Sequence, residues 1–163
     1  MVKIILASKS KVRKKILDSN NIENVVKPSS VDEDSVKLSL LKANSSPEII
    51  SKNLAELKAN KVSQKNPNIL VLGADSVIDL DGELISKPTD RKEALNILKK
   101  LNGKKHSLVS SVCIFKNESM IWNYTDKATL TMKSFSEDDL RKYLSKITDE
   151  ALYSYNVYQI EGI

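Results

Sequence analysis

A short apolar run that ends in glycine constrains the fold of this chain more than any other segment. Residues 69–72 read Ile-Leu-Val-Leu, and Gly73, Ala74 and Asp75 follow directly. Pro67-Asn68 on one side and Gly73 on the other bound the run, so the pattern predicts a buried strand over 69–72. Ligands bind at the ends of such strands in open α/β sheets. Asp75 is therefore either a functional carboxylate at a strand end or only the residue that closes the strand.

The composition predicts one domain with an aliphatic core. The chain has 163 residues, of which 40% are hydrophobic and 29% charged, which suits one globular domain and argues against disorder. Aromatic residues make up only 5%, so aliphatic side chains must fill the core. The one cysteine, Cys113, lies in the apolar run 112–115, which favours a buried thiol and excludes an internal disulfide.

Hydropathy and charge narrow the choice of partners. No apolar stretch is long enough to span a bilayer, and the run 4–7 is too brief for a signal peptide, so we expect a cytoplasmic protein without a membrane partner. The formal net charge of +5 suits nucleic acid, a membrane surface, a phosphorylated ligand or simply a lysine-rich surface. The lysines are scattered, without a dense basic block that contains aromatics, which disfavours nucleic acid as the partner.

Helix and strand signals alternate along the chain. The first predicted elements are a strand over 2–7, a helix over 11–20 with Ser10 as N-cap, a strand over 22–26 and a polar loop over 27–34. Ser46 and Pro47 begin a second helix. Its apolar stripe consists of Ile50, Leu54, Leu57 and Val62.

The second half of the chain continues the alternation. A hairpin is predicted at Asp81-Gly82, between strands over 77–80 and 83–85. Asp90 and Glu93 form a capping box for a helix that closes at Asn102-Gly103. The remaining predicted elements are a strand over 107–115, a turn at 117–118, one or two strands over 120–132 and a helix that begins at Ser136. The hairpin among alternating helices and strands predicts a mixed α/β sheet.

The first strand-to-helix junction is a candidate phosphate site. A helix N-terminus presents unpaired N–H groups, and Ser8, Ser10 and Arg13 add further donors there. Ser10 is equally explained as a helix cap, and Arg13 as a solvated side chain. No glycine-rich phosphate loop of the common kinds is present.

Four further charged residues are candidates for chemistry, namely Glu33, Lys58, Asp75 and Lys87. Glu33 and Asp75 offer the oxygen ligands that magnesium or manganese prefers, although the acidic run around Glu33 also suits a solvated loop. Lys58 borders the apolar stripe of its helix, so it is either held near the sheet or extends along a core boundary. A single histidine, His106, excludes a histidine-based triad and a zinc site of several histidines.

Six motifs, in this order, resemble the Maf family of septum-formation-inhibitor-like proteins. They are Leu6-Ala7-Ser8-x-Ser10-x-x-Arg13, Lys58-Ala59, Leu72-Gly73-Ala74-Asp75-Ser76-Val77 with Asp81-Gly82-Glu83, Lys87-Pro88-x-Asp90, Leu101-x-Gly103-x-x-His106, and Tyr158-Gln159-Ile160-Glu161-Gly162. The resemblance implies a mixed-sheet α/β fold with a central cleft, related to inosine-triphosphate-pyrophosphatase-like enzymes. It also implies cleavage of nucleoside triphosphates between the α and β phosphates, which releases nucleoside monophosphate and pyrophosphate.

The resemblance also implies residue roles. Asp75 matches the proton acceptor, and Glu33 matches an acidic position near the divalent cation that Asp75 also contacts. Phosphate-handling positions match Ser8, Arg13, Lys58 and Lys87. The family is commonly dimeric, so we expect a homodimer that binds nucleoside triphosphates together with Mg²⁺ or Mn²⁺. The alternative function is that of a non-catalytic nucleotide-binding regulator of cell division or septum formation.

Three positions, Val12, Ser76 and Glu161, match those that differ between subgroups of the family and bear on base choice. The usual Ser-Pro-Arg-Arg is Ser10-Lys11-Val12-Arg13 here, so Val12 departs from the pattern. Glu161 fits the subgroup that favours 7-methyl-GTP over dTTP and UTP, because a carboxylate accepts hydrogen bonds from guanine. Family members continue through a further strand and a glycine-rich segment, so we expect residues 1–163 to form a single Maf-like domain that lacks its C-terminal end.

Overall fold

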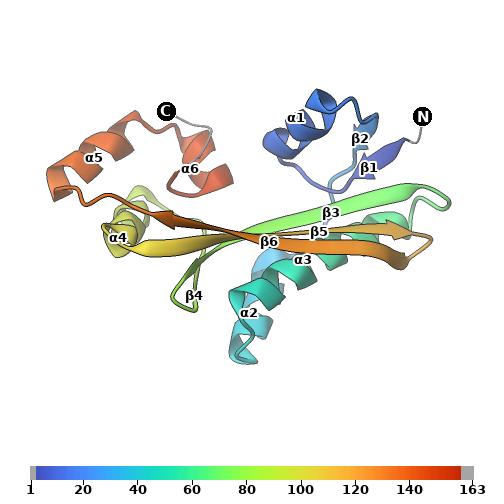
Figure 1. Cartoon of the computed structure of the whole chain (residues 1–163), viewed down its shortest axis with the longest axis horizontal. Helices are drawn as coiled ribbons and strands as arrows, with labels where there is room; N and C mark the ends of the chain where they lie inside the picture. Colours follow the sequence, from blue (N-terminus) through green and yellow to red (C-terminus); the bar gives the residue numbers. More distant parts are fainter. Residues whose placement is uncertain (1–2, 159–163) are drawn as a thin grey trace. The chain divides into compact units, whose positions relative to one another are not determined.

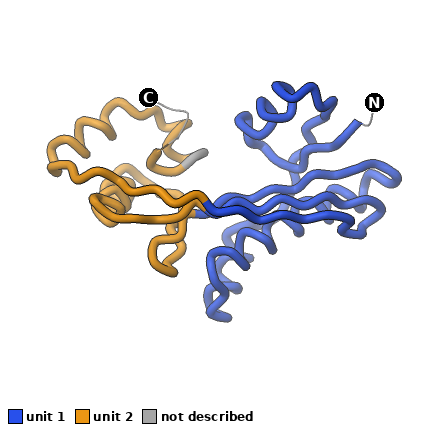
Figure 2. Tube along the Cα trace, in the orientation of Figure 1, with its two compact units in different colours: residues 1–77, 109–127 blue, residues 78–108, 128–163 orange. Residues whose placement is uncertain are grey.

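The computed structural model describes residues 3–158, apart from the side chains of residues 154 and 155. The chain forms two compact units, one of residues 1–77 with 109–127 and one of residues 78–108 with 128–163 (Figure 2). Three long strands, β3 (Leu70–Leu80), β5 (Lys105–Lys116) and β6 (Ser119–Thr131), contribute residues to both units.

The sheet is mixed, as the sequence predicts. In the described part of the chain it has six strands in the order β2-β1-β3-β5-β6, with β4 (Glu83–Ile85) paired to β3. The short strand β1 (Ile4–Leu6) runs parallel to both β2 (Asn24–Val26) and β3, whereas β4 runs antiparallel to β3. Leu6 pairs with Leu72, so β3 extends well beyond the carboxyl end of β1.

Helices cover both faces of the sheet in the first unit (Figure 1). The helix α1 (Lys11–Ser19) lies on one face, and α2 (Glu33–Lys42) and α3 (Pro47–Ser63) lie on the other. Alternate strand residues face the two layers, as strand geometry requires. One hydrophobic cluster contains Ile4, Leu6 and Leu17, and the other contains Ile5, Ala7, Ala55, Ala59, Val62, Val71, Cys113 and Phe115.

The structure corrects the predicted strand around Asp75. The strands predicted over 69–72 and 77–80 are one continuous strand, β3, and Asp75 lies in its middle rather than at its end. Gly73 does not terminate the strand. It is instead the position at which α3 packs closely against β3. A Cβ at this position would stand 2.2 Å from the carbonyl oxygen of Ala55 and 2.7 Å from Cβ of Ala59, so glycine lets α3 approach the backbone of β3.

The second unit packs helices against the end of β3 and the hairpin. Its helices are α4 (Arg91–Leu101), α5 (Glu137–Lys146) and α6 (Asp149–Tyr155). Their core includes Ile78, Leu80, Ile85, Ala94, Leu98, Leu101, Leu140, Leu144, Leu152 and Val157. The guanidinium of Arg91 donates to the carbonyl oxygens of Leu144 and Ile147 and to Asp149, and so joins three helices.

The helix caps and turns agree with the sequence signals. The side chains of Ser10, Ser46, Asp90 and Ser136 each accept a hydrogen bond from the backbone N–H three residues later. The predicted hairpin at Asp81-Gly82 is confirmed, with positive φ at both residues.

Two helices and one packing residue differ from the prediction. α6 was not predicted, and α2 begins inside the predicted loop, at Glu33, with Asp32 as its N-cap. α2 has no buried residue, so it lacks the apolar stripe that marks a helix in sequence. Leu57 was predicted to face the core, but it is 40% exposed.

Candidate active site

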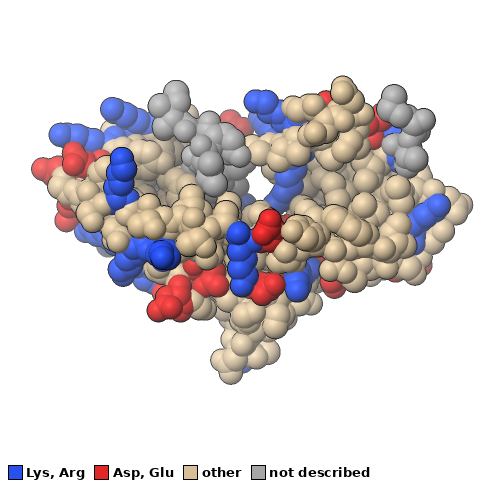
Figure 3. All heavy atoms as spheres, viewed as in Figure 1, with Lys and Arg blue, Asp and Glu red and all other residues tan. Residues whose placement is uncertain are grey.

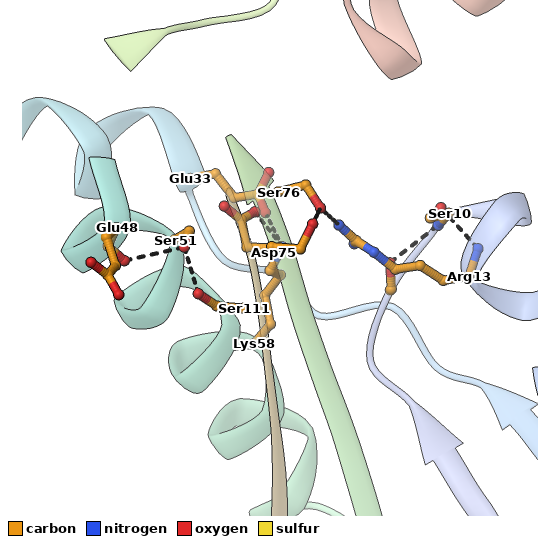
Figure 4. Close-up of polar contacts among 11 residues, drawn as sticks. Ser10, Arg13, Glu33, Glu48, Ser51, Lys58, Asp75, Ser76 and Ser111 are labelled. Atoms are coloured by element: carbon orange, nitrogen blue, oxygen red, sulfur yellow. Dashed lines mark hydrogen bonds and ion pairs between the residues drawn. The ribbon is translucent and has the colours of Figure 1, made fainter. Parts of the chain in front are cut away.

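A buried lysine joins two carboxylates from different elements (Figure 4). Lys58 on α3 is only 7% exposed, and its Nζ lies 2.9 Å from Oδ1 of Asp75 and 2.8 Å from Oε1 of Glu33. Asp75 comes from β3, and Glu33 is the first residue of α2. The three residues are far apart in sequence, and the close packing of α3 on Gly73 brings Lys58 to Asp75.

Burial sets the electrostatics of Asp75. The carboxyl group is 7% exposed, and its Oδ2 is buried without a hydrogen-bond partner among the described residues. Burial raises the pKa of Asp75 above its ordinary value, and the charges of Lys58 and Arg13 offset part of that rise. Asp75 is therefore a stronger base than an exposed aspartate, with one oxygen unused by the protein.

Arg13 forms a second cluster with serine hydroxyls from two elements. Its Nη1 donates to Oγ of Ser8 at 2.9 Å, and its Nη2 donates to Oγ of Ser76 at 3.4 Å (Figure 4). Burial lowers the pKa of Arg13, and the carboxylates of Asp75 and Glu33 act in the opposite direction. A guanidinium stays charged under such a shift, so Arg13 supplies a positive charge that faces the carboxylates.

The N-terminus of α1 lies beside this arginine. Ser10 caps the helix, and its own backbone N–H donates to Oγ of Ser8 at 3.2 Å. This junction follows the carboxyl end of β1, where open α/β sheets bind ligands, and Asp75 lies three residues beyond the β1 pairing on the neighbouring strand. The predicted phosphate site therefore lies at the end of β1. Asp75 is beside it, although Asp75 is in the middle of β3, because β3 continues past the end of β1.

The residues fit a hard divalent cation. Mg²⁺ is commonly held by one or two carboxylates together with substrate phosphates and water. Glu33 and Asp75 converge on a single ammonium, and the unpartnered Oδ2 of Asp75 is an available oxygen donor. No group of three or more histidine, cysteine or acidic residues suited to a metal occurs among residues 3–158, so such a cation needs ligands from the substrate or solvent.

The other predicted site residues lie elsewhere or are not described. Val12 is partly buried in the first turn of α1, next to Arg13. Lys87 follows β4 in the second unit, and its role in phosphate binding stays a prediction. Glu161 lies outside the described residues.

Sequence reasoning missed one cation. Lys37 lies one turn after Glu33 on α2, near enough for its charge to lower the pKa of Asp75. The available signal was the spacing of four residues between Glu33 and Lys37, which places two residues on the same face of a helix. That spacing is informative only when a helix is predicted there.

The expected partners other than a nucleotide stay predictions. Within each of the two units, the face shown in Figure 3 carries both basic and acidic side chains. No helix within the described residues combines the length and the apolar character needed to cross a bilayer.

Comparison with a solved structure defines the fold class. The HAM1 protein from Coxiella burnetii aligns with a TM-score of 0.50 and 15% sequence identity, over 79% of this chain and 71% of that protein. This similarity establishes a mixed α/β fold of the HAM1 type.

Sequence comparison defines the family. A family model described as Maf-like protein matches residues 3–163. A nucleoside triphosphate pyrophosphatase from Pelagibacter ubique is 69% identical over 163 residues, which cover 99% of this chain and 84% of that protein. A 7-methyl-GTP pyrophosphatase from Brucella abortus is 35% identical over 161 residues, which cover 99% of this chain and 81% of that protein. The chain belongs to the Maf family.

Proposed function

We propose that this protein is a nucleoside triphosphate pyrophosphatase. It hydrolyses the anhydride bond between the α and β phosphates of canonical or modified nucleoside triphosphates, and its products are a nucleoside monophosphate and pyrophosphate. The observation that carries the proposal is the convergence of Asp75, Lys58 and Arg13 at the end of β1. The names of the relatives from Pelagibacter and Brucella support the same reaction class.

The chain's own residues supply a base and positive charge for this reaction. The water oxygen forms a bond to the α phosphorus, the bond between that phosphorus and the bridging oxygen breaks, and Asp75 accepts the proton from the water. The burial of Asp75 makes it more basic than an exposed aspartate. Lys58 and Arg13 neutralise the negative charge on the phosphate oxygens, and the N–H groups at the start of α1 donate to them.

We also propose that Glu33 and Asp75 hold a Mg²⁺ or Mn²⁺ ion. Such an ion lowers the pKa of a bound water and neutralises phosphate charge. Lys58 is placed to balance the two carboxylates before the cation and nucleotide bind. A chelator should abolish turnover, and added Mg²⁺ or Mn²⁺ should restore it. Full activity after exhaustive chelation would refute this part of the proposal.

The finer assignments follow from the same function. We propose that Ser8 and Lys87 contact phosphates and that Val12, Ser76 and Glu161 contribute to base choice. We further propose a cytoplasmic homodimer, because its substrates belong to the cytoplasmic nucleotide pool. Kinetics over canonical and modified triphosphates test base choice, and light scattering after gel filtration tests the dimer.

The decisive experiment is pyrophosphate release by the wild type and by Asp75→Asn. The variant should lose turnover and keep nucleotide binding, because the amide preserves shape but accepts no proton. Asp81→Asn is the matched control, since Asp81 is exposed in the β3–β4 turn at a positive φ that asparagine also adopts. Orthophosphate as the sole product would indicate cleavage of a different bond. Nucleotide binding without any turnover by the wild type would favour a non-catalytic regulator.

A further inference from the structure

Ser110 on β5 is connected to the phosphate site by a hydroxyl contact that the proposed reaction does not use. Its Oγ lies 3.0 Å from Oγ of Ser76 on β3. Ser76 in turn accepts a hydrogen bond from Nη2 of Arg13, whose Nη1 donates to Ser8. The chain of contacts therefore begins on β5, crosses β3 and ends at the loop that follows β1.

We propose that Ser110 is a positioning residue for the nucleotide phosphates. Its hydroxyl donates to Oγ of Ser76 and thereby fixes both the side chain of Ser76 and Nη2 of Arg13. This inference rests on the proposed function, because Arg13, which Ser110 positions through Ser76, is the residue assigned there to the phosphates.

The hydrogen-bond count of Ser76 supports the direction of donation. A serine hydroxyl has one proton to donate and two lone pairs that accept. When Ser110 donates to Ser76, the lone pairs of Ser76 serve Ser110 and Arg13, and the proton of Ser76 is left for the nucleotide. Donation into Ser76 also polarises its hydroxyl and strengthens its own donation.

The geometry at Arg13 shows why such support matters. The contact of Nη1 with Ser8 is short at 2.9 Å, whereas that of Nη2 with Ser76 is 3.4 Å. Nη2 of Arg13 thus depends on a weak contact with the exposed hydroxyl of Ser76, and Ser110 restrains the rotamer of that hydroxyl. Without Ser110, Ser76 is free to rotate away, and of its two serine contacts Arg13 then keeps only the one with Ser8.

The adjacent residue on β5 provides an internal comparison. Ser111 points to the opposite face, where its Oγ lies 2.6 Å from Oγ of Ser51 on α3 and 3.0 Å from Oγ1 of Thr125 on β6 (Figure 4). Ser111 is 2% exposed, and its contacts join α3 to the sheet. Ser110 thus serves the site, whereas Ser111 at the next position supports the packing of α3 on the sheet.

The test uses an isosteric pair at position 110. Ser110→Thr keeps the hydroxyl and adds a methyl group. Ser110→Val has the same shape as the threonine variant, with a second methyl group in place of the hydroxyl. Both residues suit a β-strand. Calorimetry measures the affinity for pyrophosphate with Mg²⁺, steady-state kinetics give KM and kcat for a triphosphate, and thermal unfolding measures stability.

We expect Ser110→Val to bind pyrophosphate about three- to tenfold more weakly than wild type, the factor expected for one neutral hydrogen bond. KM should rise by a similar factor, and Ser110→Thr should bind like wild type. Ser111→Ala should lower the melting temperature and leave pyrophosphate affinity unchanged. Equal affinities of the Val and Thr variants would overturn the inference, as would a loss of affinity in Ser111→Ala equal to that in Ser110→Val.

These outcomes separate the inference from the proposed function. A wild type that binds pyrophosphate but releases none from any triphosphate refutes the pyrophosphatase, and the Val and Thr affinities still decide the role of Ser110. A wild type that turns over, with indistinguishable Val and Thr variants, refutes the inference alone. Failure of the wild type to bind either pyrophosphate or a nucleotide would overturn both.

Discussion

Gly73→Ala should damage both stability and catalysis, because the new methyl group meets backbone that cannot yield locally. Its Cβ would stand 2.2 Å from the carbonyl oxygen of Ala55, whereas ordinary van der Waals contact begins at 3.4 Å. The helix α3 must therefore move away from β3 by about 1 Å, since packed cores leave no room for a smaller adjustment.

Lys58 lies one turn beyond Ala55 on the same helix, so the displacement reaches the site directly. Its contacts of 2.9 Å with Asp75 and 2.8 Å with Glu33 would lengthen beyond hydrogen-bond distance. We expect a loss of about 3 kcal/mol in unfolding free energy, the upper end for an overpacked core. We also expect kcat to fall on the order of 100-fold, as for a catalytic group misplaced by about 1 Å.

Thermal unfolding and pyrophosphate release measure the two effects, and Gly82→Ala is the control. A Cβ at Gly82 meets nothing within 4 Å, but φ is +89°, so that substitution costs about 1–2 kcal/mol through backbone conformation alone. It should lower the melting temperature and leave kcat unchanged. A Gly73→Ala protein with wild-type stability and wild-type kcat would refute the argument that this glycine sets the position of α3.

Three further predictions follow from the electrostatics. In the absence of a divalent cation, the stability of wild type relative to Asp75→Asn should fall as the pH rises through a pKa above the ordinary aspartate value of 3.8, because burial raises the pKa of Asp75 and a raised folded pKa favours the protonated form. An unchanging difference in melting temperature between the two proteins across that window would contradict this expectation. Lys37→Gln should move that pKa upward and raise KM by at most about fivefold, whereas Lys42→Gln on the exposed end of α2 should change neither; pH-dependent unfolding without the cation measures the pKa, and steady-state kinetics measure KM. Burial raises the pKa of Cys113 to about 11, so a thiol reagent should modify it slowly until the protein unfolds, and rapid labelling of the folded protein would count against a buried thiol.

Local signals predicted the helices whose caps and apolar stripes are contained in a few consecutive residues. Ser10, Ser46, Asp90 and Ser136 each satisfy backbone N–H groups within their own first turn, so their effect does not depend on tertiary structure. The helix α2 escaped prediction because it buries none of its residues and therefore carries no periodic apolar face. Lys37 was missed for the same reason.

Local sequence is sufficient to predict the helix caps, the turn at Asp81-Gly82 and the family motifs, because these depend on residue types at fixed short spacings. The packing role of Gly73 inside β3 and the bridge from Lys58 to Asp75 and Glu33 are visible only in the folded chain. The folded chain also shows that Ser110 and Ser111 serve opposite faces of the sheet. The physical reason is that these contacts join elements distant in sequence, whose approach depends on how helices and strands pack rather than on local patterns.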